Sequence, residues 1–149
     1  MIVKKNKIEY VVGFMFSSDF KKVALIEKTK PNWQKGKLNG IGGKVEKDEF
    51  PLDAMVREFK EEAGIKYDYW NKFCTINSIN SIVYFYYAVC SKNKFSEIKT
   101  IEEEKVIKCC VNEIPKNIIT NINWLIPMAI SMSKDLADEF MITEIYNEK

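Results

Sequence analysis

The amino-acid sequence predicts an α+β fold, an α/β/α sandwich in which a mixed β-sheet lies between helices. Segments rich in β-branched and aromatic residues occur on both sides of a central amphipathic helix, and a second helical pattern comes late in the chain. Several strands with only two helices are typical of a layered α+β arrangement. Because no linker, repeat or low-complexity segment interrupts the pattern, we expect a single domain over residues 1–149.

The N-terminal third predicts a hairpin followed by a loop. Residues 8–16 and 22–27 are rich in β-branched and aromatic side chains, and the turn-forming residues 17–19 separate them. Residues 30–44 then contain one proline and four glycines. We interpret this stretch as a long loop whose backbone can approach a ligand closely.

Residues 51–63 predict an amphipathic helix. Pro51 suits the first helical position, and Gly64 suits a left-handed C-terminal cap. Apolar side chains recur at helical spacing along one stripe, which we expect to be buried. The stripe consists of Leu52, Met55, Val56, Phe59 and Ala63.

The second half of the chain predicts three more strands and a second helix. The strands are expected over residues 73–79, 82–90 and 105–111. We expect the helix to begin near Asn123 or Ile126 and to run to about Ala137, with Pro127 in its first turn.

The composition excludes several classes of protein. The formal net charge is +2, which gives no reason to expect a nucleic-acid partner. No apolar run is long enough to cross a bilayer, and residues 1–10 are too polar for a signal peptide. There is no histidine, and the four cysteines form no CxxC pair, so neither a zinc site nor a Ser-His-Asp triad is expected. We therefore expect a cytoplasmic protein with reduced, mostly buried cysteines.

Three glutamates lie away from the apolar stripe of the predicted helix. Glu58, Glu61 and Glu62 are spaced i, i+3 and i+4, which places their carboxylates on one face. Carboxylate oxygens are the ligands that Mg²⁺ and Mn²⁺ prefer, and a divalent cation would relieve the repulsion between them. The alternative is a solvated acidic face balanced by a neighbour such as Lys60.

The glycine loop and the helix together resemble the signature of the Nudix hydrolase family. The motif extends from Gly43 to Ile65, and Phe59 stands where the family usually has Ile, Leu or Val. Phe59 lies on the buried stripe, so we expect this difference to affect packing alone. The positions in register are Gly43, Glu49, Arg57, Glu58, Glu61, Glu62, Gly64 and Ile65. The resemblance implies a Nudix fold and a hydrolase that cleaves a pyrophosphate bond.

The resemblance also implies a set of metal ligands. Glu58, Glu61 and Glu62 match the metal-binding carboxylates of the family, and Gly42 matches a backbone carbonyl that often binds the same cluster. Mg²⁺, or Mn²⁺ in its place, would activate a water molecule and offset the charge of the substrate.

Other positions match residues that support catalysis. Arg57 matches an arginine that orients a catalytic glutamate, Glu49 a glutamate near the helix start, and Lys44 a lysine that contacts substrate phosphate. A further carboxylate is expected from the loop before the strand at residues 105–111. Glu104 is the first candidate, and Glu103 and Glu102 are alternatives.

Two segments outside the motif bear on the substrate. Residues 38–45 resemble a stretch of the 8-oxo-purine nucleoside triphosphatases, in which Asn39 would match a base-binding asparagine. Asn121 and Trp124 lie in a segment similar to the one that contacts the purine edge there. The acidic pair of that subgroup is absent, since Thr120 and Asn121 occupy the corresponding positions. Packing in the core is the alternative for Trp124.

The leading functional prediction is a Mg²⁺-dependent pyrophosphohydrolase of nucleoside triphosphates, including oxidised or modified purine nucleotides, that yields a monophosphate and pyrophosphate. The first alternative is hydrolysis of another diphosphate, such as ADP-ribose, a dinucleotide, a nucleotide sugar or capped RNA. The second is a Nudix domain that senses a ligand without turnover. We expect a small-molecule nucleotide as the ligand, no membrane association, and a monomer or homodimer.

Overall fold

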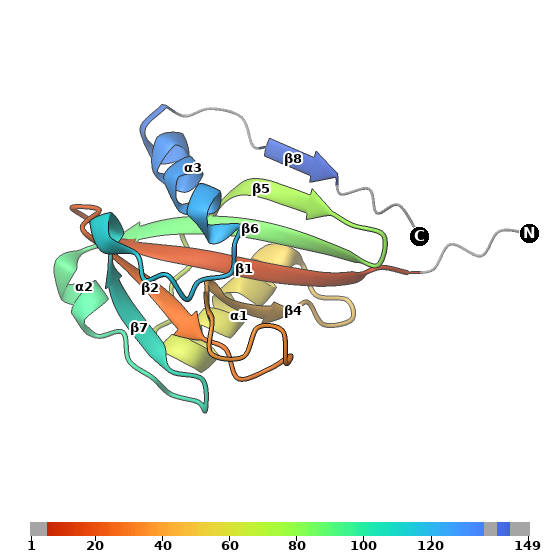
Figure 1. Cartoon of the computed structure of the whole chain (residues 1–149), viewed down its shortest axis with the longest axis horizontal. Coiled ribbons are helices and arrows are strands. Elements are labelled where there is room, and N and C mark those ends of the chain that lie inside the picture. Colours follow the sequence, from red (N-terminus) through yellow and green to blue (C-terminus); the bar gives the residue numbers. More distant parts are fainter. Residues whose placement is uncertain (1–5, 136–139, 144–149) are drawn as a thin grey trace, which may run out of the picture.

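A mixed sheet of eight strands forms the centre of the computed structural model, which describes residues 6–135 and 140–143 (Figure 1). The strands are β1 (Ile8–Ser17), β2 (Lys22–Glu27), β3 (Leu38–Asn39), β4 (Ile41–Lys44), β5 (Asn71–Asn77), β6 (Ser81–Cys90), β7 (Val106–Cys110) and β8 (Phe140–Thr143). The main path runs β3-β2-β1-β6-β5-β8, with β4 paired to β1 and β7 paired to β2. The β1–β6 and β5–β8 pairs are parallel and the others antiparallel, so the predicted mixed sheet is confirmed.

The strands β1 and β2 form the predicted hairpin, with Met15 opposite Ala24. The first half of β1 pairs instead with β4, so that Val11 lies opposite Gly43 and Val12 opposite Gly42. The prediction of a continuous loop over residues 30–44 is therefore wrong, because β3 and β4 lie within it. These strands are too short and too rich in glycine to show a strand pattern, and their pairing with β1 and β2 depends on the tertiary fold.

The helix α1 (Pro51–Ala63) has the predicted bounds. Pro51 is its first residue, and Gly64 caps it with φ 80° while its N–H donates to Lys60 O. The remaining predicted strands differ by one or two residues at their ends. The short helix α2 (Lys92–Ser96), the 3-10 helix η1 (Val111–Glu113) and β8 were not predicted.

The helix α3 (Ile122–Asp135) begins before the predicted Asn123 or Ile126. Two turn hydrogen bonds, from Ile122 N to Ile119 O and from Asn123 N to Thr120 O, start the helix there. Pro127 consequently lies inside α3 and not in its first turn, which corrects that prediction. The predicted end at Ala137 lies outside the described residues.

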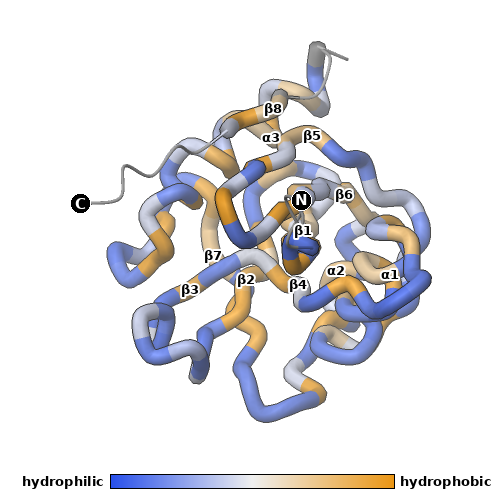
Figure 2. The backbone as a smooth tube through the Cα atoms, turned by 90° about the vertical axis from the view of Figure 1, so that its right-hand side faces the viewer, coloured by the Kyte–Doolittle hydropathy of each residue, from blue (hydrophilic) through white to orange (hydrophobic). Residues whose placement is uncertain are grey.

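Two apolar cores pack on the two faces of the sheet. Residues of α1 and α2, such as Phe59 and Phe95, form one core with alternate strand residues such as Met15. The other core joins α3 residues such as Leu125 to the opposite strand residues, including Phe14. Figure 1 shows α1 and α3 on opposite sides of the strands, and Figure 2 shows the hydrophobic segments along the strands with hydrophilic loops outside. The predicted α/β/α sandwich is therefore confirmed.

The buried stripe of α1 and the cysteines follow the sequence prediction closely. Phe59 is fully buried and contacts Trp70 edge-on at 5.1 Å between ring centroids. Leu52 is an exception, because it lies at the exposed start of α1. Three of the four free cysteines are buried, and Cys110 is exposed. Along the part of the chain that the structure describes, none of the helices is long and apolar enough to cross a bilayer.

Candidate active site

Arg57 connects α1 to the loop that precedes it. Its guanidinium donates to both oxygens of Glu49, at 2.8 Å from Nε and 2.9 Å from Nη2. The Nη1 atom lies 2.8 Å from Glu58 Oε1 and 3.3 Å from Glu61 Oε2, and Nη2 donates to Lys44 O at 3.0 Å. The hydrogen bonds from Arg57 lower the pKa of Glu49, and Glu49 in turn raises the pKa of Arg57. This network fixes the direction of the Glu58 and Glu61 carboxylates on α1.

Glu62 is buried without a hydrogen-bond partner for one of its oxygens. The side chain is 8% exposed, and its Oε2 atom has no partner among the described residues. Burial, together with the nearby charges of Glu58 and Glu104, raises the pKa of Glu62 to about 8. The sequence prediction placed this side chain on the exposed face of α1. The side chain is buried instead, near the charges of Glu58, Lys28 and Glu104.

The glycines of β4 lie directly against a carboxylate of α1. A Cβ atom at Gly43 would be 2.5 Å from the carboxyl carbon of Glu58, and one at Gly42 would be 1.9 Å from Val11 O. Burial raises the pKa of Glu58, although Arg57 opposes this shift. A side chain at Gly42 would push β4 away from β1, whereas a side chain at Gly43 would displace the Glu58 carboxyl group.

Glu104 lies near enough to Glu62 to influence its charge, and it is held through both of its own oxygens. Lys28 Nζ donates to Oε1 at 3.0 Å, and the Thr29 N–H and hydroxyl donate to Oε2 at 2.5 and 3.2 Å. Burial alone would raise the pKa of Glu104, but these hydrogen bonds hold it below its ordinary value. Glu102 and Glu103 are more exposed than Glu104. Of the three candidate carboxylates, Glu104 was the first choice, and the structure holds it in a defined position.

A cleft of about 380 Å³ begins at the Gly42–Gly43 strand and extends away from α1. Asn39 and Asn121 line it, and Asn121 Oδ1 is buried without a hydrogen-bond partner among the described residues. The Oδ1 atom of Asn39 accepts from Gly40 N–H at 2.8 Å. The cleft has the size of a small-molecule site, with apolar walls and a few polar groups.

The structure brings most of the predicted site residues together, but two of the four predicted substrate-binding residues lie outside the cleft. The side chain of Lys44 is exposed and does not line the cleft. Trp124 is 38% exposed, so it is not packed in the core, and it does not line the cleft either. Within the described residues, no three acidic or cysteine side chains form a ready-made metal cage. Arg57 Nη1 instead forms hydrogen bonds with both Glu58 and Glu61.

Two cleft residues were missed as site candidates. Lys28 lines the cleft and also contacts Glu104, and Trp33 lines the opening with 63% of its surface exposed. Lys28 directly follows the end of β2, and its sequence context does not distinguish it from an ordinary surface lysine. Trp33 gave a stronger signal, since a tryptophan in a glycine-containing loop suggests an exposed ring.

Comparisons with known proteins were made by family model, by sequence and by structure. A family model described as NUDIX domain matches residues 8–124, which is most of the chain. None of the curated proteins matches the chain by sequence.

Several solved structures share the fold. The MutT NUDIX hydrolase from Burkholderia pseudomallei has 18% sequence identity and a TM-score of 0.68, and the match covers 83% of this chain and 98% of that one. An ADP-ribose pyrophosphatase from Streptococcus suis has 17% identity and a TM-score of 0.68, with 93% and 100% coverage. The NUDIX domain of Shewanella oneidensis NrtR, solved with ADP ribose, has 20% identity and a TM-score of 0.66, with 87% and 90% coverage.

Proposed function

The chain belongs to the Nudix family of pyrophosphate-bond hydrolases, and from this premise we propose that it hydrolyses nucleoside triphosphates with the help of a divalent metal. The observation that carries the proposal is the position of the cleft. One strand, β4, separates a cleft of nucleotide size from a row of carboxylates on α1. A nucleoside in the cleft would place its phosphates beside those carboxylates.

The residues present fit a divalent metal ion. Glu62 Oε2 is buried without a partner, and the surrounding carboxylates raise the pKa of Glu62. Both features correspond to a group that lacks a cation. We propose that Glu58, Glu61 and Glu62 hold Mg²⁺ or Mn²⁺, with the backbone carbonyl of Gly42. When bound, the metal would lower the pKa of the attacking water and offset the charge of the phosphates.

The protein groups have separate roles in this mechanism. Arg57 orients Glu58 and, through Glu49, holds the loop before α1 in place. Glu104 is the proposed acceptor of the proton from the attacking water, because hydrogen bonds from Lys28 and Thr29 hold its carboxylate in place. Water then bonds to phosphorus as the bridging P–O bond breaks, and a nucleoside monophosphate and pyrophosphate leave.

The cleft supports a nucleobase as the recognised group. Asn121 Oδ1 can accept a hydrogen bond from an N–H of a base, and Asn39 lies in the same cleft. The exposed ring of Trp33 offers a surface on which a base can stack. We propose purine nucleotides, including oxidised ones, as the preferred class. The roles given in the sequence prediction to Lys44 and Trp124 would require substrate atoms beyond the cleft.

Hydrolysis of a different diphosphate is the second candidate. Two structures with the same fold are described with ADP-ribose, one as a pyrophosphatase and one as a complex. The Lys28 ammonium lines the cleft and suits a second phosphate or a ribose in that region as well. A purely ligand-sensing role is the third candidate, and the complete set of carboxylates on α1 argues against it.

A substrate panel tests the proposal. The protein is incubated with Mg²⁺ or Mn²⁺ and with purine and pyrimidine triphosphates, ADP-ribose, dinucleotides, nucleotide sugars and capped RNA. We expect pyrophosphate and a monophosphate from purine triphosphates. Release of AMP and ribose phosphate from ADP-ribose alone would favour the second candidate, and tight binding without turnover would favour the third.

The base cleft is tested by Asn39→Ala and Asn121→Ala. Both variants should change the ratio of kcat/KM between purine and pyrimidine triphosphates, by about tenfold where a buried hydrogen bond is lost. The same changes should have a smaller effect on the kcat of the best substrate. Asn117→Ala is the control, because Asn117 is exposed and bonds Gly36 O outside the cleft. An equal loss for every base would contradict the base cleft.

A further inference from the structure

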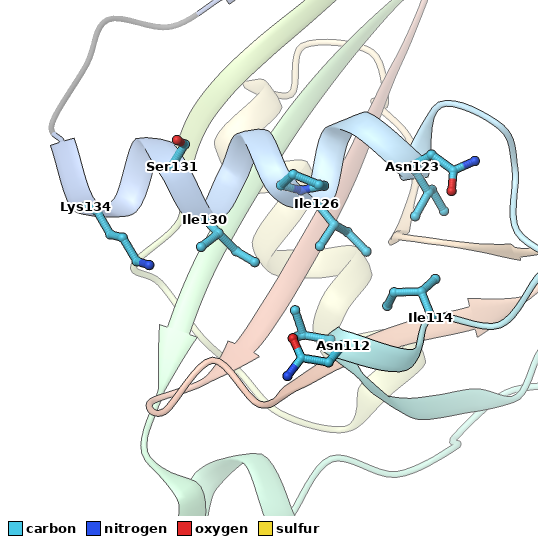
Figure 3. A pocket seen from close by; sticks show the side chains of 10 residues that line it. Asn112, Ile114, Asn123, Ile126, Ile130, Ser131 and Lys134 are labelled. Atoms are coloured by element: carbon cyan, nitrogen blue, oxygen red, sulfur yellow. The ribbon is translucent and has the colours of Figure 1, made fainter.

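A second hollow, of about 410 Å³, lies on the α3 side of the sheet, on the face opposite α1. Figure 3 shows α3 along one side of it and the η1 segment along the other. Ile126 and Ile130 of α3 and Ile114 after η1 provide an apolar surface. The volume falls within the range of small-molecule sites, and the mixture of apolar walls and a few polar groups is typical of them.

The polar side chains of this hollow have unused hydrogen-bonding capacity. Asn112 and Lys134 form no side-chain hydrogen bond or ion pair with any described residue. Asn123 donates through Nδ2 to Thr120 O at 3.2 Å, and its Oδ1 has no protein partner in the same part of the chain. Among the residues that the structure describes, the lining contains one cation, Lys134, and no carboxylate. Its charge is therefore complementary to a single negative group.

We propose that this hollow binds a small amphipathic anion, such as a short-chain carboxylate. The apolar part of the ligand covers Ile114, Ile126 and Ile130, and the anionic group lies at Lys134, with Asn112 as a neighbouring donor. Burial of apolar surface supplies the attraction, and the single cation selects the charge. The hollow and the cleft both border the α3 face of the sheet, but no described residue lines both, so this site is separate from the one proposed for the nucleotide.

A matched pair of probes tests the proposal, octanoate and 1-octanol. Titrations use the full chain without metal or nucleotide, so that the result is independent of the proposed hydrolase activity. Backbone amide shifts in ¹⁵N spectra should change in η1 and along α3 and stay constant in α1. Octanol should bind about threefold to tenfold more weakly than octanoate, because it lacks the ion pair.

Two pairs of variants separate the charge from the cavity. Lys134→Gln should reduce octanoate binding to the level of octanol, while the control Lys116→Gln should not, because Lys116 is exposed and does not line the hollow. Asn112→Trp should fill the hollow and abolish binding of both probes. Glu113→Trp, at the next exposed position, should leave binding unchanged.

Other results would overturn the proposal. Lys134 also lies in the last turn of α3, where a cation stabilises a helix through its dipole. If that were its only role, Lys134→Gln would lower the melting temperature and leave octanoate binding unchanged. Equal affinities for octanoate and octanol in the unmodified protein, or shift changes confined to the cleft, would equally contradict an anion site between η1 and α3.

Discussion

At the residue scale, different surroundings shift the pKa values of two carboxyl groups of the same site, Glu62 and Glu104, in opposite directions. Glu62 is buried without a partner, which raises its pKa to about 8, whereas Glu104 receives three hydrogen bonds and has a lowered pKa. At neutral pH and without metal, one of these groups holds a proton and the other does not. Divergent pKa values of neighbouring acids are typical of sites that carry out proton transfer or bind cations.

The raised pKa of Glu62 predicts that the metal-free protein loses stability as the pH rises. The unfolded carboxyl has the ordinary value of 4.5, and the folded one about 8. Between these values the unfolded chain releases a proton that the folded protein retains, so the free energy of unfolding falls with pH. The stabilisation is complete below about pH 4.5 and is lost by about pH 8.

Glu62→Gln should remove this dependence. In EDTA, urea unfolding at pH 5, 7 and 9 should show a flatter profile for the variant, which should exceed the unmodified protein by about 2–4 kcal/mol at pH 9. Turnover with Mg²⁺ should be abolished. Glu61→Gln is the control for stability, because Glu61 is 46% exposed and its profile should follow the unmodified protein. If the stability of Glu62→Gln and of the unmodified protein changed with pH in the same way, the pKa of Glu62 would not be raised in the folded protein.

At the element scale, the close contact of β4 with both α1 and β1 depends on two glycines. A methyl group at Gly42 would meet the backbone oxygen of Val11, which cannot move without separating β4 from β1. A methyl group at Gly43 would meet the carboxyl group of Glu58, which ends a side chain and can rotate away. The two positions therefore differ in what each substitution disturbs.

Gly42→Ala and Gly43→Ala form a matched pair of predictions. Gly42→Ala should lower the free energy of unfolding by about 1–3 kcal/mol, as expected for overpacking against a rigid neighbour. Gly43→Ala should change stability much less but reduce activity by about 10–100-fold, because it displaces the Glu58 carboxylate. Urea unfolding and steady-state kinetics on both variants measure the two effects. If Gly43→Ala lowered the stability more than Gly42→Ala did, the Glu58 side chain would be held too rigidly to rotate away, and its ion pair with Arg57 alone would not explain this.

The same elements show what the sequence can and cannot predict. The bounds of α1 follow from local signals, namely Pro51, Gly64 and an apolar stripe, and the structure confirms them. The strands β3 and β4 have no such signal, since partners distant in sequence hold them in place. Helical spacing gave the common face of Glu58 and Glu61. It could not give the burial of Glu62, because the surroundings of this side chain include Lys28 and Glu104, which lie far from it in the sequence.

At the scale of the whole molecule, the sheet divides the protein into regions with different tasks. The carboxylates of α1 and the nucleotide cleft meet at Gly43, which lines the cleft and contacts Glu58. The core under α3 contributes Phe85 and Ile119 to the wall of the cleft, and Asn121 reaches the cleft from the turn before α3. A metal and a nucleotide would therefore bind to different elements and stabilise the same folded state.

This arrangement predicts that the two ligands stabilise the protein through separable residues. A ligand at one hundred times its Kd adds about 2.7 kcal/mol to the free energy of unfolding. Thermal unfolding is measured with Mg²⁺ alone, and then with Mg²⁺ and a non-hydrolysable purine triphosphate analogue. Each addition should raise the melting temperature of the unmodified protein, and EDTA should reverse the first increase.

Two variants, Glu62→Gln and Asn121→Ala, should each lose a different one of these increases in melting temperature. Glu62→Gln should lose the increase due to Mg²⁺, because it removes a proposed metal ligand. Asn121→Ala should keep that increase and lose most of the one due to the analogue, because Asn121 lines the cleft and lies outside the acidic row. If Asn121→Ala abolished both increments, the cleft and the carboxylates would form one inseparable site. If Mg²⁺ gave no increase in the unmodified protein, the carboxylates of α1 would not be its ligands, since a ligand that binds the folded state must stabilise it.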